Sequence, residues 1–333
     1  MRFVLDAEQK LFGDTLDKLL SESDALGAAR AWAAGDSGPG LRLWRSLADA
    51  GVFALAVPES AGGAGPLPVE LVTAFRALGA HGVPGPYVET VAVAELLGLL
   101  APANEWLARI AGGSAVASLV FPPDVPYGLD ADVADVLLVV DGDRPRLGEP
   151  GEMRVSLDPV RRLFSVRPGK FVSDISDISA ADAADAADAA DAADAAAADL
   201  GTLMCAAQLA GVGDRLLSVT VEYAKTRHQF GRPIGSFQAV KHHLANAYVA
   251  LEYARPLLYG AALAHGTPDF PREVSAAKAA ASDATYFASR IALQVHGAIG
   301  YTGEYDPSLL IRKARALRGA WGSPSAHRAR VLA

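Results

Sequence analysis

Residues 226–245 carry the side chains best suited to bind a ligand. They read TRHQFGRPIGSFQAVKHHLA and lie where one long helical pattern ends and another begins. The stretch offers the guanidinium of Arg227, the amides of Gln229 and Gln238, the ring of Phe230, and glycines that let the backbone approach a ligand closely. Such a loop suits a pyrophosphate and an adenine. An ordinary helix–helix turn with a surface arginine is the alternative, and these residue types leave both interpretations open.

Three motifs of the chain resemble signatures of the acyl-CoA dehydrogenase family of flavoproteins, and they occur in the same order along the chain. Residues 227–242 follow the pattern R-x-Q-F-G-x-x-I-x-x-F-Q-x-x-K-H. Residues 294–315, QVHGAIGYTGEYDPSLLIRKAR, are similar to that family's Q-x-x-G-G-x-G loop. Residues 51–65, GVFALAVPESAGGAG, look like its G-L-x-G-L-x-x-P-E-x-x-G-G-x-G motif. The matches cover most of the chain, so the resemblance implies the family's order of helical domain, β domain and helical bundle.

The hydrophobic patterning predicts the same mainly α architecture. We expect an N-terminal helical domain over 1–112, a reduced middle β domain over 113–172, an Ala/Asp-rich connector over 173–199 and a C-terminal four-helix bundle over 200–333. Helical periodicity is found in 4–20, 41–50, 75–78, 91–100, 200–226, 237–259, 273–296 and 307–321. Short β-branched runs predict strands at 114–121, 135–142, 153–157 and 163–169.

The connector repeats aspartate every third residue from Asp182 to Asp194 in an alanine background. Steps of three rotate by about 300° on an α-helix, so the carboxylates spiral around it and share no face. The glycine and terminal glutamate of an EF-hand loop are missing. We therefore expect a solvated acidic segment, helical or partly disordered, in preference to a calcium site.

Composition excludes several classes of protein. The 333 residues carry 30 Lys+Arg and 38 Asp+Glu, a net charge of −8, which is the wrong sign for a nucleic-acid binder. The one cysteine, Cys205, cannot form an intramolecular disulfide or a cysteine-based metal site. Adjacent His242 and His243 lack a third ligand at helical spacing, so we predict no metal site. The longest apolar stretch, 90–101, is interrupted by Glu95 and is too short to span a bilayer, and no signal peptide is recognised, so we expect a cytoplasmic protein without a membrane segment.

The resemblance implies FAD that lies extended between two subunits, with its adenosine-diphosphate end held by the paired chain. The motif matches assign that end to Arg227, Gln229, Phe230 and Gln238, and to a second loop of Gln294, Val295, His296, Gly297 and Ala298. Ala298 departs from the family pattern, which has a second glycine there.

The family's reaction requires a carboxylate that takes the substrate's α-proton while N5 of the flavin accepts the β-hydride. In many relatives this base follows the Q-x-x-G-G loop by about 23 residues, a position held here by Trp321; in others it precedes the R-x-Q-F-G turn, near Gly201. Neither side chain can accept a proton, so we predict no catalytic residue in this chain. Glu304 and Glu252 are the candidates for a relocated base, each with a structural alternative: a capping or subunit contact for Glu304, and pairing with Arg255 or a neighbouring chain for Glu252.

The β region also lacks the T-E-x-x-x-G-S-D-like loop and the K-x-x-I-[TS]-N/S-like strand of the family's flavin pocket. The chain thus resembles the short, base-lacking subunit of the α2β2 dehydrogenases that actinobacteria use on CoA thioesters of steroid side chains. The resemblance implies a full-length dehydrogenase subunit, an acyl-CoA substrate and an electron-transfer acceptor protein as partners. A self-sufficient dehydrogenase with a relocated base and a flavin-free scaffold or acyl-CoA-binding subunit are the alternatives.

Overall fold

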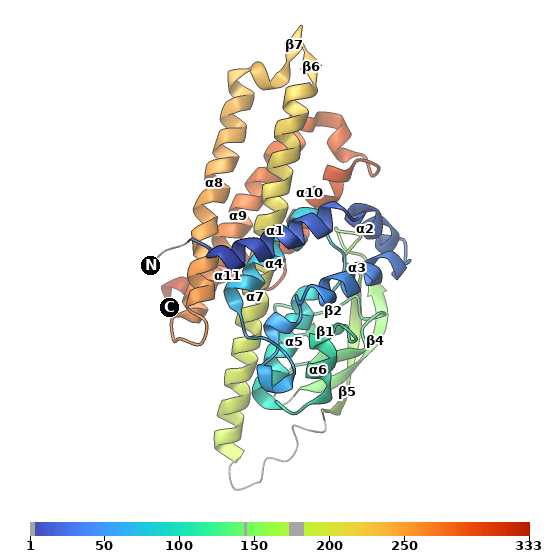
Figure 1. Cartoon of the computed structure of the whole chain (residues 1–333), viewed down its shortest axis with the longest axis vertical. Coiled ribbons are helices and arrows are strands. Elements are labelled where there is room, and N and C mark those ends of the chain that lie inside the picture. Colours follow the sequence, from blue (N-terminus) through green and yellow to red (C-terminus); the bar gives the residue numbers. More distant parts are fainter. Residues whose placement is uncertain (1–3, 143–144, 173–182) are drawn as a thin grey trace. The chain divides into compact units, whose positions relative to one another are not determined.

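The computed structural model describes residues 4–142, 145–172 and 183–333 (Figure 1). Residues 173–182 of the predicted connector lie outside this part of the chain. The chain divides into two compact units. The first comprises the chain up to Glu22, Val72–Gly82 and Cys205–Ala333, and the second comprises Ser23–Leu71 and Val83–Met204.

Four C-terminal helices and the end of a fifth build most of the first unit. Helix α9 is central, because α8, α10 and α11 all pack against it. Ala247, Leu251 and Ala254 of α8 form a buried cluster with Ala284 and Ala288 of α9, and the four alanines let the two helices approach closely. The helices of this unit are α1 (Ala7–Ser21), α8 (Gln238–Leu263), α9 (Phe270–His296), α10 (Asp306–Gly319) and α11 (Pro324–Leu332), with parts of α4 (Pro68–His81) and α7 (Ala183–Thr226).

Glycines set the distance between α4 and α7 in this unit. A Cβ at Gly79 would lie 2.0 Å from the carbonyl oxygen of Gln208, and one at Gly211 would lie 1.9 Å from that of Arg76. No other residue fits either position without moving a helix. Beside this contact, Arg76 donates to Asp214 at 2.7 Å and to the Tyr259 hydroxyl at 3.1 Å, which ties α4 to α7 and α8.

A buried lysine joins α9 to the end of α10. The ammonium group of Lys278, a residue with no exposed surface, donates to the carbonyl oxygens of Leu317 at 3.2 Å, Arg318 at 3.3 Å and Gly322 at 3.4 Å. The Ser282 hydroxyl lies 3.3 Å away. Leu317 and Arg318 lie in the last turn of α10, where carbonyls have no partner within the helix, so the cation satisfies the end of α10.

The second unit contains a five-stranded sheet in the order β1-β3-β4-β5-β2. Strand β1 pairs with β3 in parallel, and the remaining pairs within the sheet are antiparallel. The strands are β1 (Ala117–Val120), β2 (Gly128–Leu129), β3 (Val136–Val139), β4 (Arg146–Arg154) and β5 (Leu163–Phe171), accompanied by helices α2 (Ala25–Ala33), α3 (Gly38–Asp49), α5 (Tyr87–Leu100) and α6 (Glu105–Ala111) and short 3-10 turns at Ala54–Ala56 and Glu59–Ala61.

The structure confirms the predicted mainly α fold with a small sheet and a C-terminal helical region, and differs from the prediction in detail. The expected strand at 153–157 belongs to β4, which ends at Arg154. The sequence pattern of β4 does not read as a strand because it contains Pro150. A proline is tolerated at this position, where β4 pairs only with β5. The prediction also missed α2, α6, α11 and β2, all of them short.

The Ala/Asp tract is helical from Ala183, since α7 runs unbroken to Thr226. Asp188 and Asp191 are exposed, whereas Asp194 is half-buried. Burial and the neighbouring Asp191 raise the pKa of Asp194 to about 6. Residues 187–226 are long and apolar enough to cross a membrane by length and composition alone, but 83% of their most apolar window is buried.

A buried ionic network in the second unit links helix α2 to the sheet. Asp130, 1% exposed, accepts hydrogen bonds from the Trp32 indole at 2.9 Å and from Nε of Arg162 at 3.3 Å. Arg162 also pairs with Asp132 at 2.7 Å and lies over the Trp32 ring. Burial raises the pKa of Asp130 to about 7, although Trp32 and Arg162 oppose the shift.

This network predicts a pH-dependent stability with a defined sign. Because the pKa of Asp130 is about 7 in the folded protein and 3.8 ordinarily, the folded state holds a proton that the unfolded state has lost. The free energy of unfolding should fall by on the order of 2 kcal/mol between about pH 5.5 and about pH 8, and level off above that. Asp130→Asn should remove this slope in urea unfolding, whereas Asp132→Asn, the partly exposed partner of the same arginine, should retain it. Equal slopes in wild type and Asp130→Asn would contradict the assignment.

Candidate cofactor-binding site

The predicted R-x-Q-F-G motif forms a hairpin between the C-terminal end of α7 and the N-terminal end of α8 (Figure 1). Strand β6 (His228–Gln229) pairs antiparallel with β7 (Arg232–Pro233), and the 3-10 turn Ile234–Ser236 leads into α8. The backbone N–H of Arg227 donates to the carbonyl of Tyr223, and that of Ile234 donates to the carbonyl of Arg227, both at 2.8 Å. The hairpin is therefore anchored to the last turn of α7.

Two residues with positive φ make the turn of the hairpin. Phe230 has φ +54° and Gly231 has φ +77°, which is the pattern of a type I′ turn. Glycine adopts this conformation without strain, but for a bulky side chain such as phenylalanine it is a genuine outlier. Phe230 is 90% exposed. Its nearest aromatic contact is an edge-on approach to Phe237, with the ring centres 6.1 Å apart.

The polar side chains of the motif are available for a ligand. Arg227, Gln229 and Gln238 are all exposed. Within the described part of the chain, Arg227 forms no ion pair, whereas the neighbouring Arg232 lies over the ring of Phe237 at 4.1 Å. The motif thus presents a guanidinium without an ion pair, two amides and an aromatic ring.

The second predicted loop begins where α9 ends. Gly297 has φ +65° and opens the 3-10 turn Gly297–Tyr301. Gln294 and Ala298 are exposed, Val295 and Gly297 are partly buried, and His296 is 4% exposed. Nδ1 of His296 lies 2.8 Å from the carbonyl oxygen of Ala292, and burial lowers the pKa of the ring.

Tertiary packing brings the two motifs together through an aromatic contact. The ring of His296 lies 4.5 Å from that of Tyr223 on α7 and 5.3 Å from that of Tyr305. Tyr223 is also the residue whose carbonyl anchors Arg227. Nε2 of His296 is buried without a hydrogen-bond partner among the described residues. A guanidinium, exposed amides and an exposed ring fit the pyrophosphate and adenine of a dinucleotide, so the residues present are compatible with the FAD end that the resemblance implies.

The two positions at which the family resemblance places the catalytic base, Trp321 and Gly201, are both buried. Trp321 is 3% exposed with φ +55°, and its carbonyl oxygen lies 2.8 Å from Nε2 of His327. Gly201 lies in a fully buried stretch of α7. Glu252, one candidate for a relocated base, pairs with Arg255 at 2.8 Å, which is the structural role given above as its alternative. Glu304, the other candidate, is exposed.

Asp130 is a titratable group that sequence reasoning missed. Its carboxyl has a pKa of about 7, but it is sealed inside the second unit and cannot reach a substrate directly. No sequence signal singles it out, because its environment comes from Trp32 and Arg162, 98 and 32 residues away. Across the described residues, no group of three or more His, Cys, Asp or Glu side chains could hold a metal ion.

Comparison with known proteins gives consistent matches over both ends of the chain. Residues 6–114 match the acyl-CoA dehydrogenase N-terminal domain, and residues 191–333 match the acyl-CoA dehydrogenase C-terminal domain. The chain is 33% identical over 321 residues to acyl-CoA dehydrogenase IpdE2 of Mycobacterium tuberculosis, covering 95% of this chain and 94% of that protein. It is 32% identical to IpdE2 of Mycolicibacterium smegmatis over 325 residues, covering 96% of each.

Solved structures share the fold. A chain of the ChsE4-ChsE5 complex from Mycobacterium tuberculosis superposes with a TM-score of 0.82 at 23% identity, covering 100% of this chain and 98% of that one. A chain of the Tcur3481-Tcur3483 steroid ACAD G363A variant superposes with a TM-score of 0.80, also at 23% identity, covering 98% of this chain and 96% of that one.

The strained turn predicts a gain in stability at the expense of the exposed ring. Asn-Gly is the preferred type I′ pair, so Phe230→Asn should raise the free energy of unfolding by up to about 1 kcal/mol in urea unfolding. Phe237→Asn is the matched control, because Phe237 has φ −78° and gains nothing from the change. It should destabilise the protein by losing ring contacts. A Phe230→Asn protein no more stable than wild type would argue against strain at this turn.

Proposed function

This chain belongs to the acyl-CoA dehydrogenase family, and from that premise we propose that it is one subunit of a hetero-oligomeric, FAD-dependent acyl-CoA dehydrogenase. The family makes it an oxidoreductase that acts on CH–CH donors. When bound, the flavin supplies a hydride acceptor for the α,β-dehydrogenation of a CoA thioester. The proposal assigns this chain the adenine and pyrophosphate side of its partner's FAD site.

One observation carries the proposal: the residues expected at the adenine side are displayed on the surface, whereas both usual base positions are occupied by residues that cannot accept a proton. Arg227, Gln229 and Gln238 are exposed and Phe230 is held outward by a strained turn. Such a turn has a conformational cost, and strain of this kind is found where a ligand or partner is bound. Trp321 and Gly201 are buried.

Each exposed group has a role suited to its chemistry. Arg227 would bind the pyrophosphate, because a guanidinium donates two parallel hydrogen bonds to phosphate oxygens. Gln229 and Gln238 would hydrogen-bond the polar edges of the nucleotide, and Phe230 would pack against the adenine ring. The loop of Gln294, Val295, His296, Gly297 and Ala298 would close the same end of the cofactor, with His296 fixed between Tyr223 and Tyr305.

The partner would supply what this chain lacks: the catalytic carboxylate and the loops that hold the flavin ring. We propose a full-length acyl-CoA dehydrogenase subunit in an α2β2 heterotetramer, with an acyl-CoA substrate and an electron-transfer acceptor protein. A steroid side chain as the acyl group draws support from one neighbour, which is named a steroid ACAD, and assembly with a second subunit draws support from another, which is named a ChsE4-ChsE5 complex. A cytoplasmic location is in keeping with the net charge of −8 and the single, buried cysteine.

The direct test is expression of the chain alone and together with the product of an adjacent gene encoding a full-length dehydrogenase. We expect colourless, inactive protein in the first case and a yellow, active complex in the second. Active FAD-loaded protein from the chain alone would refute the proposal. A stoichiometric complex without flavin would identify the chain as a scaffold instead.

Arg227→Ala in the complex should weaken FAD retention roughly ten- to hundredfold, as expected for the loss of a charged hydrogen bond. FAD occupancy after gel filtration gives the measurement. Arg215→Ala is the matched control, since Arg215 is an exposed arginine on α7, 12 residues before the motif. Unchanged occupancy in Arg227→Ala would remove this residue from the site.

Glu252→Gln and Glu304→Gln decide whether this chain carries a relocated base. With the partner supplying the carboxylate, both variants should keep kcat within about threefold of wild type, because removing a general base normally costs about a hundredfold or more. Glu252→Gln should also lower stability slightly by loss of the Arg255 pair. A hundredfold loss of kcat in either variant, with FAD still bound, would favour the self-sufficient enzyme.

A further inference from the structure

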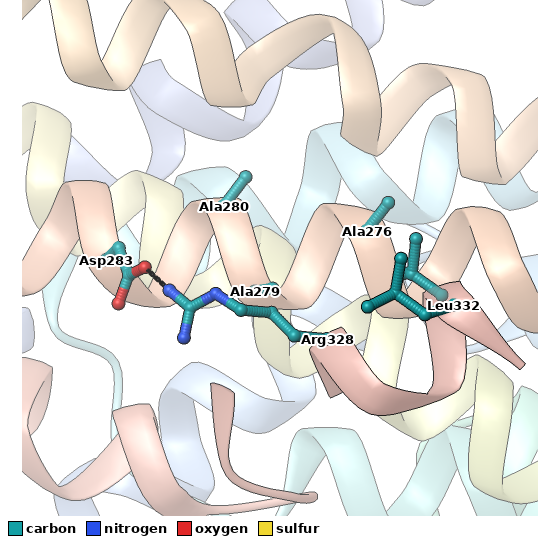
Figure 2. A pocket seen from close by; sticks show the side chains of 7 residues that line it. Ala276, Ala279, Ala280, Asp283, Arg328 and Leu332 are labelled. Carbon is teal, nitrogen blue, oxygen red and sulfur yellow. Dashed lines mark hydrogen bonds and ion pairs between the residues drawn. The ribbon is translucent and has the colours of Figure 1, made fainter. Parts of the chain in front are cut away.

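Helices α9 and α11 of the first unit line a cavity that is open to solvent and that the proposed function does not use (Figure 2). Its volume is about 420 Å³, within the range of small-molecule sites. The walls are apolar, with Ala276, Ala279 and Ala280 from α9 and Leu332 from α11. The cavity lies on α9 at least 11 residues before Gln294, about 17 Å along the helix, so it is separate from the cofactor-side loop.

One edge of the cavity is strongly basic. Arg328 of α11 lines the cavity and pairs with Asp283 of α9, as Figure 2 shows, and Arg318 of α10 lies 3.5 Å from the same carboxylate. One turn further along α9, Arg315 and Arg318 lie over the ring of Tyr286 at 5.3 and 5.0 Å. Arg290, Arg315, Arg318 and Arg328 form what we call the arginine cluster.

The positive charge of this cluster is not neutralised locally. Asp283 is shared by two of its arginines, and within the described residues Arg290 and Arg315 form no ion pair. A hydrogen bond from Arg290, reinforced by the charges of Arg315 and Arg318, lowers the pKa of Tyr286. Nε of Arg318 is buried without a partner in the described structure. Residues 270–333 carry nine Lys/Arg and four Asp/Glu in a chain of net charge −8, so the excess is a local feature.

We propose that the cavity and the arginine cluster together bind an anionic amphiphile: a carboxylate that carries an unbranched alkyl chain. The alkyl chain lies against the alanine methyl groups of α9 and Leu332, where burial of apolar surface is favourable. The carboxylate binds Arg318 and Arg328, whose planar guanidinium groups match it in shape and exceed the single charge of Asp283. A small inorganic anion gains nothing from the apolar walls, and an uncharged alkyl compound leaves the cluster uncompensated.

Photo-crosslinking tests the site locally, whether or not a partner subunit is present. The probe is decanoate with a diazirine at the end of its chain, applied to the purified protein both alone and together with its co-expressed partner, and labelled peptides are identified by mass spectrometry. We expect label on peptides of α9 and α11. Unlabelled decanoate should compete at least tenfold more effectively than decanol or acetate. Equal competition by decanol, or label outside these helices only, would overturn the proposal.

Substitutions in this chain complete the test. Ala280→Phe fills the cavity, and Arg318→Gln with Arg328→Gln removes two charges; each should reduce labelling at least tenfold. Ala326→Phe, on an exposed part of α11, and Arg272→Gln, an exposed arginine of α9 outside the cluster, should leave it within twofold. Ala276→Phe serves as a second cavity-filling variant if Ala280→Phe does not fold. Undiminished labelling in a folded cavity-filling variant would refute the site.

Discussion

The buried ammonium group of Lys278 is the interaction on which the C-terminal part of the molecule depends. Removing a charge from water costs several kcal/mol unless polar partners surround it, so a lysine with no exposed surface constrains everything within its reach. Its partners are the carbonyls of Leu317, Arg318 and Gly322, which must converge on one point of α9. Helix α10 therefore ends where it does because α9 carries a cation there.

The contacts that fix the end of α10 also constrain the turn that follows it. Trp321 takes a positive φ and is buried, and its carbonyl meets His327, whose other ring nitrogen lies 3.3 Å from the Ser275 hydroxyl of α9. The position to which the family resemblance assigns a catalytic carboxylate is here part of the core packing. The same contacts lay α11 along α9, which creates the apolar cavity and brings Arg328 to Asp283.

The hairpin between α7 and α8 differs from this region, because its backbone is fixed whereas its side chains are exposed. Its backbone is anchored by short hydrogen bonds to α7, while its side chains make few contacts within the chain. A rigid backbone that displays an exposed ring and an exposed guanidinium is preorganised for binding, because little further ordering is needed when a ligand arrives. The contact between Tyr223 and His296 holds the second loop beside it.

The sequence alone determined the elements with strong local signals and the motifs within them. Helices α8, α9 and α10 were predictable because their apolar residues repeat at helical spacing, and strands β1, β3 and β5 because short β-branched runs are bounded by turn residues. Helix α11, strand β2 and the unbroken course of α7 were not, since they are short or lack that pattern. Only the tertiary structure decided that Lys278 is buried, that Asp130 lies between Trp32 and Arg162, and that three arginines gather around Tyr286 while a fourth, Arg328, pairs with Asp283. These environments arise from residues tens of positions apart in the chain, and a local pattern holds no information about which distant side chains will meet.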